Sequence, residues 1–188
     1  MQKLLRKQIT KTLELDYLLH LPPNAEKADS LPLILFLHGS GERGSDLARV
    51  SQVGLPKLVE ADPQFPFIFV APQCPTNTIW LTHFDALNAL LDDVIAAYPV
   101  DTRRIYITGL SMGGTGTWGF AAAYPERAAA IVPVCGGDGW FSGDDSLCAL
   151  KDTPTWTFHG ALDQVIPLAE TARMVRALKA CGGNVRLT

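Results

Sequence analysis

A serine stands among glycines in the segment ITGLSMGGTG, residues 107–116, where its hydroxyl could act as a nucleophile. The pattern Gly109-x-Ser111-x-Gly113 is typical of a sharp turn from a strand into a helix that exposes the serine. Small residues two positions before and after the serine allow such a turn to close. We therefore predict that Ser111 is the nucleophile of an acyl-transfer reaction. The alternative is a glycine-rich turn with an incidental serine.

A second glycine-rich segment, LFLHGSGERGSDL at residues 35–47, follows an apolar run. Acyl transfer places negative charge on an oxygen, and backbone N–H groups directed at that oxygen lower the barrier. We predict that the amides of Ser40 and Met112 are these donors, with Gly41 as the next candidate in the loop. His38 is expected to brace the loop by hydrogen bonding rather than to transfer protons.

A carboxylate follows another apolar run in FHGALDQVIP, residues 158–167. Asp163 comes after Ser111 in the chain, as the acid does in hydrolases whose catalytic residues occur in the order serine, acid, histidine. Such a carboxylate orients the histidine and stabilises its cationic form while it holds the serine proton. The alternative is that Asp163 caps the helix predicted from Leu168.

These motifs must be positioned by the elements between them, which alternate between short apolar runs and helical patterns. The strand-like runs cover residues 13–21, 31–39, 66–72, 103–109, 129–137 and 154–160, and helical patterns cover 82–99, 112–124 and 168–181. Nearly continuous apolar runs are typical of strands buried on both faces of a parallel sheet. We predict a single α/β domain over residues 1–188, with a mostly parallel, doubly wound sheet and helices on both faces.

Composition limits the classes of partner. The 188 residues include 47% hydrophobic and 19% charged residues and carry a formal net charge of −3. Lys and Arg are scattered rather than gathered in a stripe, so we expect neither nucleic acid nor an anionic membrane as a partner. The sequence contains no run of 18 apolar residues and no signal peptide pattern, which predicts a cytoplasmic location, or secretion if a leader has been removed.

The cysteines suggest no metal site. The four cysteines are widely spaced and form no C-x-x-C pair: Cys74, Cys135, Cys148 and Cys181. No Cys and His lie at the spacing of a zinc finger either, so we expect no metal. Free structural thiols are the favoured interpretation for a cytoplasmic protein, with a disulfide as the alternative. The oligomeric state is left open.

Four separated motifs together resemble the carboxylesterase/phospholipase branch of the α/β-hydrolases. In chain order they are LPLILFLHGSGERGSDL, APQCP, the block RRIYITGLSMGGTGTWGFAAAYPERAAAIVPVCGG and FHGALDQVIP. Dienelactone hydrolases and the predicted peptidase-like esterases are near neighbours of this branch. The resemblance extends from about Leu13 to the last residue.

This resemblance implies an α/β-hydrolase fold and hydrolysis of small-molecule carboxylic esters through a serine acyl-enzyme, without a metal or an organic cofactor. By position it implies Ser111 as nucleophile, Asp163 as triad acid, and the amides of Ser40 and Met112 as oxyanion donors. Residues that fall where the family lines its substrate pocket are Trp80, Trp140 and Phe141, and plain packing is their alternative. Gly41 is a further possible pocket residue. Thioester, peptide or amide hydrolysis is the alternative chemistry.

The sequence departs from the family pattern at the catalytic histidine. In the family this residue follows the acid, beyond one more helix and strand, whereas all four histidines here precede Asp163: His20, His38, His83 and His159. A serine without a base is a weak nucleophile. We therefore expect a C-terminally truncated α/β-hydrolase domain that lacks the end of its last strand, the histidine loop and the final helix.

Two alternatives to truncation stay open. One is a genuine short variant that recruits another base or acts feebly through its oxyanion donors. The other is a catalytically impaired or non-catalytic scaffold that binds a ligand. His159 is expected to brace its own turn, and His83 is a remote candidate for the base.

Overall fold

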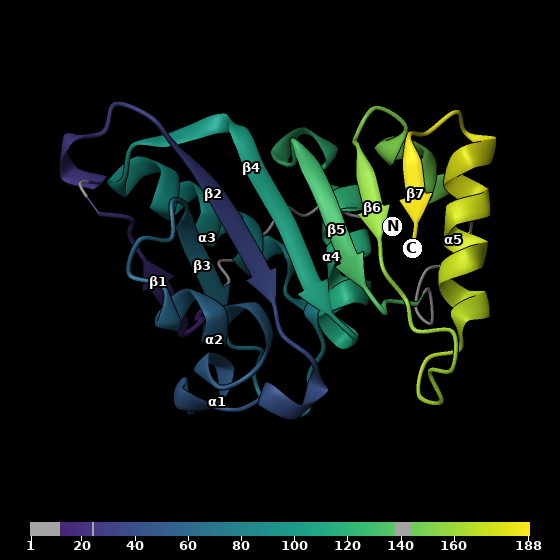
Figure 1. The fold of residues 1–188 in the computed structure, drawn as a ribbon, viewed down its shortest axis with the longest axis horizontal. Coiled ribbons are helices and arrows are strands. Elements are labelled where there is room, and N and C mark those ends of the chain that lie inside the picture. The colour runs from purple at the N-terminus through teal and green to yellow at the C-terminus, as the bar shows by residue number, and fades with distance from the viewer. Residues whose placement is uncertain (1–11, 24, 138–143) are drawn as a thin grey trace, which may run out of the picture.

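One seven-stranded sheet forms the centre of the computed structural model, which describes residues 12–23, 25–137 and 144–188 (Figure 1). The strand order is β1-β3-β2-β4-β5-β6-β7. Among the strands of the described residues, β1 and β3 form the one antiparallel pair, and the other pairs are parallel. The strands are β1 (Tyr17–His20), β2 (Leu31–Leu37), β3 (Ile68–Pro72), β4 (Val100–Leu110), β5 (Ala130–Val134), β6 (Thr155–Thr157) and β7 (Val185–Leu187). The predicted mostly parallel α/β sheet is confirmed.

The helices connect these strands. The α-helices are α1 (Ala48–Ser51), α2 (Gly54–Ala61), α3 (Phe84–Ala97), α4 (Met112–Ala123) and α5 (Leu168–Ala180). Short 3₁₀ segments are η1 (Ala25–Lys27), η2 (Ser40–Glu42), η3 (Trp80–Thr82), η4 (Pro125–Arg127) and η5 (Asp144–Leu150). The three predicted helices are α3, α4 and α5. The helices α1 and α2 were not predicted, because α1 is a single turn and the first turn of α2 contains a glycine and a proline, which usually mark loops.

Apolar side chains pack against both faces of the sheet. The larger core cluster joins β2 to β5 with α3, α4 and α5, and it includes Leu35, Ile107, Leu91, Trp118 and Leu178. A smaller cluster uses the alternate side chains of β2 and β3 and packs them under α1 and α2: Phe36, Phe69, Ala71, Val50 and Val59. Helices therefore lie on both faces, as predicted, but they cover them unequally (Figure 1).

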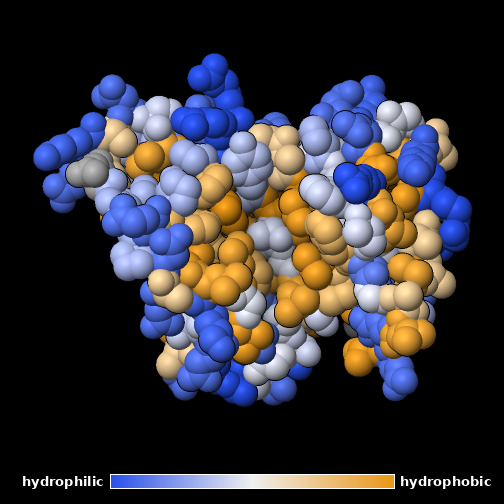
Figure 2. Space-filling model, in the orientation of Figure 1, coloured by the Kyte–Doolittle hydropathy of each residue, from blue (hydrophilic) through white to orange (hydrophobic). Residues whose placement is uncertain are grey.

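The strands β4 and β5 are buried on one face only. Along β4, Ile105 and Ile107 are buried while Tyr106 and Thr108 are half-buried, and β5 alternates in the same way. Figure 2 shows an apolar surface in the middle of this view. The expectation of burial on both faces is wrong for these two strands, because no helix of the described part of the chain lies over their outer face.

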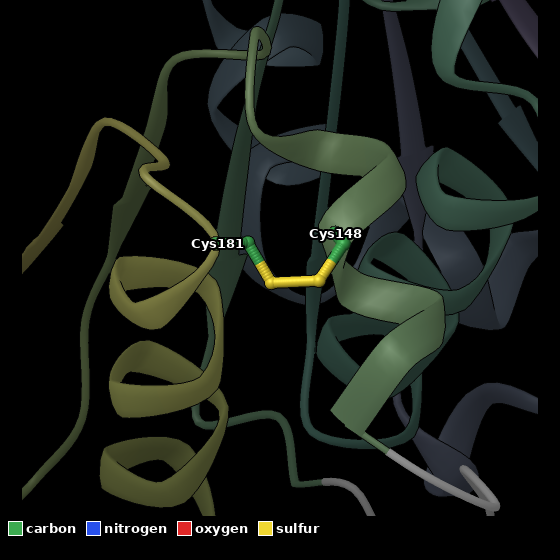
Figure 3. The surroundings of a disulfide bond; sticks show 2 residues. All are labelled: Cys148 and Cys181. Carbon is green, nitrogen blue, oxygen red and sulfur yellow. A yellow bond between two sulfur atoms is a disulfide. The ribbon is translucent and has the colours of Figure 1, made fainter.

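A disulfide joins Cys148 of η5 to Cys181 at the end of α5, with 5.2 Å between the two Cα atoms (Figure 3). The expectation of free thiols is therefore wrong for this pair, whereas Cys74 and Cys135 are free. The two linked cysteines are 33 residues apart in sequence. Only the packing of α5 against η5 brings them together, and no local sequence pattern reports that contact.

Parallel pairing brings the carboxyl ends of four strands to one edge of the sheet. Leu37 of β2 pairs with Gly109 of β4, and Leu110 of β4 pairs with Val134 of β5. Val134 in turn forms a bridge with Phe158, just beyond β6. The segments that follow these strands carry Ser40, Ser111 and Asp163, so these three residues leave the sheet at this edge. Within the described residues, β7 pairs with β6 alone and lies at one end of the strand order.

Candidate active site

Ser111 stands alone between the end of β4 at Leu110 and the start of α4 at Met112. Its backbone has φ 57° and ψ −117°, a conformation that residues other than glycine rarely adopt. Two hydrogen bonds hold it there: its amide donates to the Val134 carbonyl at 2.9 Å, and its carbonyl accepts from the Thr115 amide at 2.9 Å. Backbone strain of this kind persists only where the surroundings fix it, and such residues cluster at functional sites.

The glycines around Ser111 have a steric reason. A side chain at Gly113 would overlap the Leu37 carbonyl of β2, and one at Gly109 would overlap the Gly113 carbonyl across the turn. A side chain at Gly114 would overlap the Val134 carbonyl of β5. The beginning of α4 can therefore pack directly on the backbone of the sheet, which holds Ser111 at the edge.

Two candidate oxyanion donors flank Ser111. Met112 is the first residue of α4, and the amides of a first helical turn have no partner within the helix. The helix dipole also favours negative charge at this end. On the other side, a methyl group added at Gly39 would come within 3.8 Å of the Ser111 Cβ, so the loop that carries Ser40 lies beside the serine. Ser40 begins η2 and is exposed.

His38 braces this loop, as predicted. Its ring is buried, and Nε2 accepts a hydrogen bond from the Cys74 amide at 2.9 Å. The proton must then lie on Nδ1, which donates to the Gly39 carbonyl at 2.6 Å. Burial lowers the pKa of His38, and this effect outweighs the opposing hydrogen bond to Gly39 and the charge of Glu42. The neutral ring thus links the Ser40 loop to the backbone of Cys74 by hydrogen bonds.

Further contacts of the Ser40 loop were missed by the sequence analysis. Arg43 donates from Nε to the Ser40 carbonyl at 3.0 Å and from Nη1 to the Thr78 carbonyl at 3.1 Å. Gln73 donates from Nε2 to the Glu42 carbonyl at 2.8 Å. The segment 73–78 therefore acts as the support of the loop. The APQCP motif was the signal that could have identified this role, because it places Gln73 and Cys74 directly after a buried strand.

Trp80 does not line a substrate pocket, so this expectation is wrong. Its side chain is fully buried, and its Nε1 donates to the His38 carbonyl at 2.9 Å. A side chain at Gly116 would meet the Trp80 Cβ at 2.7 Å, so the glycine leaves the space that the tryptophan fills. Trp80 is a packing residue beneath the Ser40 loop. Nε1 is the one polar atom of this side chain, and the His38 carbonyl accepts its hydrogen bond.

The other predicted pocket residues are Trp140, Phe141 and Gly41. Trp140 and Phe141 lie outside the described residues. Gly41 is exposed in η2, next to Ser40, and a methyl group there would meet no atom within 4 Å. Its place in the pocket stays a prediction.

Asp163 lies in the loop between β6 and α5. Its Oδ1 accepts from the amides of Val165 at 2.8 Å and Ile166 at 3.0 Å. These two backbone hydrogen bonds hold the pKa of Asp163 below its usual value, with a smaller contribution from His159. Asp163 does not cap α5, whose N-cap residue is Pro167. The carboxylate is therefore fixed through one oxygen, while its side chain stays partly exposed.

Cys135 lies near both Ser111 and Asp163, which the sequence analysis did not anticipate. It follows β5 with a φ of 39° and is a free, half-buried thiol. Burial raises the pKa of Cys135 most, the Ser111 backbone lowers it through a hydrogen bond, and the Asp163 charge raises it. Nothing in the sequence marks Cys135, because its position follows from strand order alone.

The histidine rings are engaged with their own neighbours. His159 contacts Thr171 and Ile166, and His20 contacts the Phe65 carbonyl at 3.3 Å. His83 Nε2 lies 2.8 Å from Thr78 Oγ1. The structure therefore brings Ser111, Met112, the Ser40 loop and Asp163 to one edge of the sheet. Each of the four imidazoles contacts residues other than Ser111.

The family model of phospholipases and carboxylesterases matches residues 77–188, a range that includes both Ser111 and Asp163. The chain belongs to this phospholipase/carboxylesterase family. Its sheet, with the predicted order of serine and acid, has the α/β-hydrolase fold. The family resemblance inferred from the motifs is thereby confirmed, and it identifies the chain as a member of a family of hydrolases.

This phospholipase/carboxylesterase family member is also similar to individual proteins. A poly(3-hydroxyoctanoate) depolymerase of Pseudomonas fluorescens is 27% identical over 172 residues, which cover 78% of this chain and 61% of the relative. The crystal structure of a thermostable esterase is 35% identical with a TM-score of 0.77, over 94% of this chain and 50% of that one. An acetyl xylan esterase of Aspergillus awamori shares the fold, with 18% identity, a TM-score of 0.66, and coverage of 89% and 74%.

The chain spans about half to three fifths of the length of the first two of these relatives. Within the residues that the structure describes, no helix is both long and apolar enough to cross a bilayer.

Proposed function

We propose that this family member cleaves small-molecule carboxylic esters through an acyl-enzyme on Ser111. The observation that carries the proposal is the backbone of Ser111, held at φ 57° on the corner between β4 and α4. This corner lies beside the Ser40 loop and on the same sheet edge as Asp163. The membership in a family of esterases supports the same chemistry.

In the proposed reaction, Ser111 Oγ attacks the ester carbonyl carbon and the C=O electron pair moves onto oxygen. The amides of Ser40 and Met112 donate hydrogen bonds to that oxyanion. Collapse of the intermediate breaks the bond to the alcohol, which takes up the proton that the base removed from Ser111. A water molecule, deprotonated by the same base, then releases the acid from Ser111. Asp163 orients the base and stabilises its cationic form.

The proposed reaction needs a base beside Ser111. None of the four histidines in these 188 residues follows Asp163, where the family has its catalytic histidine. His159 cannot turn toward Ser111 without giving up both of its ring contacts. We therefore expect the 188-residue chain to form the acyl-enzyme slowly, several orders of magnitude below the rate of a complete triad. The scaffold that binds an ester without turning it over, left open by the sequence, is the second candidate function.

Added imidazole separates these two functions. If Asp163 and Ser111 flank the place of the base, free imidazole should occupy it and accelerate release of nitrophenolate from a short-chain nitrophenyl ester. Imidazole also attacks such esters in solution, so the Ser111→Ala variant supplies the background rate. We expect rescue above that background in the unmodified chain and a weaker rescue in Asp163→Asn. Equal rates with and without Ser111 at every imidazole concentration would instead support the binding scaffold.

We also propose that the protein works in an oxidising compartment rather than in the cytoplasm. The disulfide between Cys148 and Cys181 supports this, because cytoplasmic thiols are kept reduced. Alkylation of cells before lysis, followed by mass spectrometry of the two cysteine peptides, tests it. Unmodified, linked peptides are expected, and two alkylated peptides would contradict the proposal.

A further inference from the structure

His159 follows β6, and its buried ring has a partner at each nitrogen. Nε2 lies 2.8 Å from the Ile166 carbonyl oxygen, in the loop that carries Asp163. Nδ1 lies 2.7 Å from the hydroxyl of Thr171, a buried residue of α5. One imidazole thus joins the end of β6, the Asp163 loop and α5.

The protons of this cluster can be counted. A carbonyl oxygen can only accept, so the contact with Ile166 requires a proton on Nε2. The Thr171 hydroxyl lies 2.5 Å from the Gly136 carbonyl and must donate its only proton there. That hydroxyl can then only accept from His159, which requires a proton on Nδ1 as well. Both ring nitrogens are donors, and an imidazole with two N–H groups is a cation.

A buried cation needs a compensating charge, and Asp163 provides it. The Asp163 Oδ2 atom lies 3.6 Å from Nε2 of His159, while Oδ1 is held by the amides of the loop. Without this carboxylate, a charge on the buried imidazole would be uncompensated, which is strongly unfavourable. The ion pair and the hydrogen bonds therefore support each other.

We propose that His159 is an imidazolium that fixes the Asp163 loop on the sheet edge and thereby positions the catalytic acid. It links the end of β6 to Ile166 in the loop, and through Thr171 it reaches Gly136 after β5. His159 is a positioning residue, since its ring nitrogens are turned toward these partners. The catalytic consequence rests on the proposed role of Asp163, whereas the charge state of His159 does not.

The charge state is measured without any activity. In the protein labelled with ¹⁵N at histidine, long-range ¹H–¹⁵N correlation spectra distinguish protonated from unprotonated ring nitrogens. Near neutral pH we expect two protonated nitrogens for His159, assigned by the loss of its signals in His159→Gln. One unprotonated nitrogen in His159 would overturn the proposal. This result would leave the role of Ser111 as nucleophile untouched.

Two substitutions at Thr171 then test the hydroxyl relay. Thr171→Ser keeps the oxygen that accepts from Nδ1, and Thr171→Val replaces it with a methyl group of the same shape. We expect the doubly protonated signature of His159 to persist in the serine variant and to be lost in the valine variant. Thr155→Val is the matched control, because Thr155 is also buried but its hydroxyl donates to the Thr153 carbonyl. A doubly protonated His159 in Thr171→Val would contradict the relay.

The effect on catalysis is read from the imidazole-rescued acylation of Ser111. Displacing the acid should slow this step about tenfold or more in Thr171→Val, because small errors in position are costly in rate. Thr171→Ser and Thr155→Val should stay within about twofold of the unmodified chain. Equal slowing in the two valine variants would mean that general destabilisation, rather than the position of Asp163, causes the loss.

Discussion

The indole of Trp80 stands edge-on to the imidazole of His38, with 5.0 Å between ring centroids, and its Nε1 donates to the His38 carbonyl at 2.9 Å. His38 in turn holds Gly39 and Cys74. The segment from residue 74 to Trp80 and the Ser40 loop are thus tied together beneath Ser111. These contacts hold a glycine-rich loop in one conformation, which the proposed role of the Ser40 amide requires.

Replacing Trp80 by Phe should destabilise the protein by about 1–3 kcal/mol, because the buried His38 carbonyl loses its donor and a small cavity remains. Denaturant unfolding at equilibrium measures the change. Trp156→Phe is the matched control, since Trp156 is 41% exposed and its Nε1 bonds the Thr188 hydroxyl at the surface. Its cost should be below about 1 kcal/mol. Equal costs would contradict the bracing role of Trp80.

The buried His38 should make stability depend on pH. Burial lowers its folded-state pKa below the ordinary 6.5, so the unfolded chain binds a proton first as the pH falls. The free energy of unfolding should therefore fall between about pH 7 and pH 5. His38→Gln should flatten this slope, even though it is less stable overall. His20→Gln serves as the control and should keep the slope, and loss of the slope in the control alone would refute the assignment.

The close approach of α4 to β2 should tolerate no side chain at Gly113. Gly113→Ala places a methyl group against the Leu37 carbonyl and should cost at least about 3 kcal/mol or prevent folding. Gly41→Ala meets no atom within 4 Å and should change the free energy of unfolding by less than about 1 kcal/mol. Thermal and denaturant unfolding of both variants measure the change in the free energy of unfolding. A stable Gly113→Ala would mean that α4 does not pack on the sheet backbone as described.

The Cys148–Cys181 disulfide should contribute about 3–4 kcal/mol, as expected for a link across 33 residues. A thiol count under denaturing conditions should give two thiols before reduction and four after it, from the four cysteines of the chain. Cys148→Ser should lose the stabilisation, and Cys135→Ser should not. Four thiols without reductant would show that the bond does not form.

Local sequence signals were enough for the turn at Ser111. Its strand, its glycines and its helix are consecutive, so their steric logic could be followed along the chain. The order of Ser111 and Asp163 with respect to buried strands also placed both at one edge, because parallel strands end together. The brace formed by His38 was predictable for the same reason, since it touches its own loop.

Contacts between distant segments were not predictable in this way. The buried place of Trp80 depends on the space at Gly116, and the disulfide depends on how α5 packs on η5. Cys135 comes near Ser111 only because β5 lies next to β4. The half-buried outer face of β4 and β5 was misjudged because their apolar composition resembles that of strands covered on both sides. In each case the deciding partner is far away in sequence.

The measurement that tests the central claim most directly is the mass of the protein after incubation with excess nitrophenyl acetate and imidazole. We expect a single added acetyl group, located by peptide mapping on Ser111. It should appear more slowly without imidazole and be absent in Ser111→Ala. An unmodified Ser111 after prolonged incubation, or ester cleavage that proceeds equally in Ser111→Ala, would contradict the central claim.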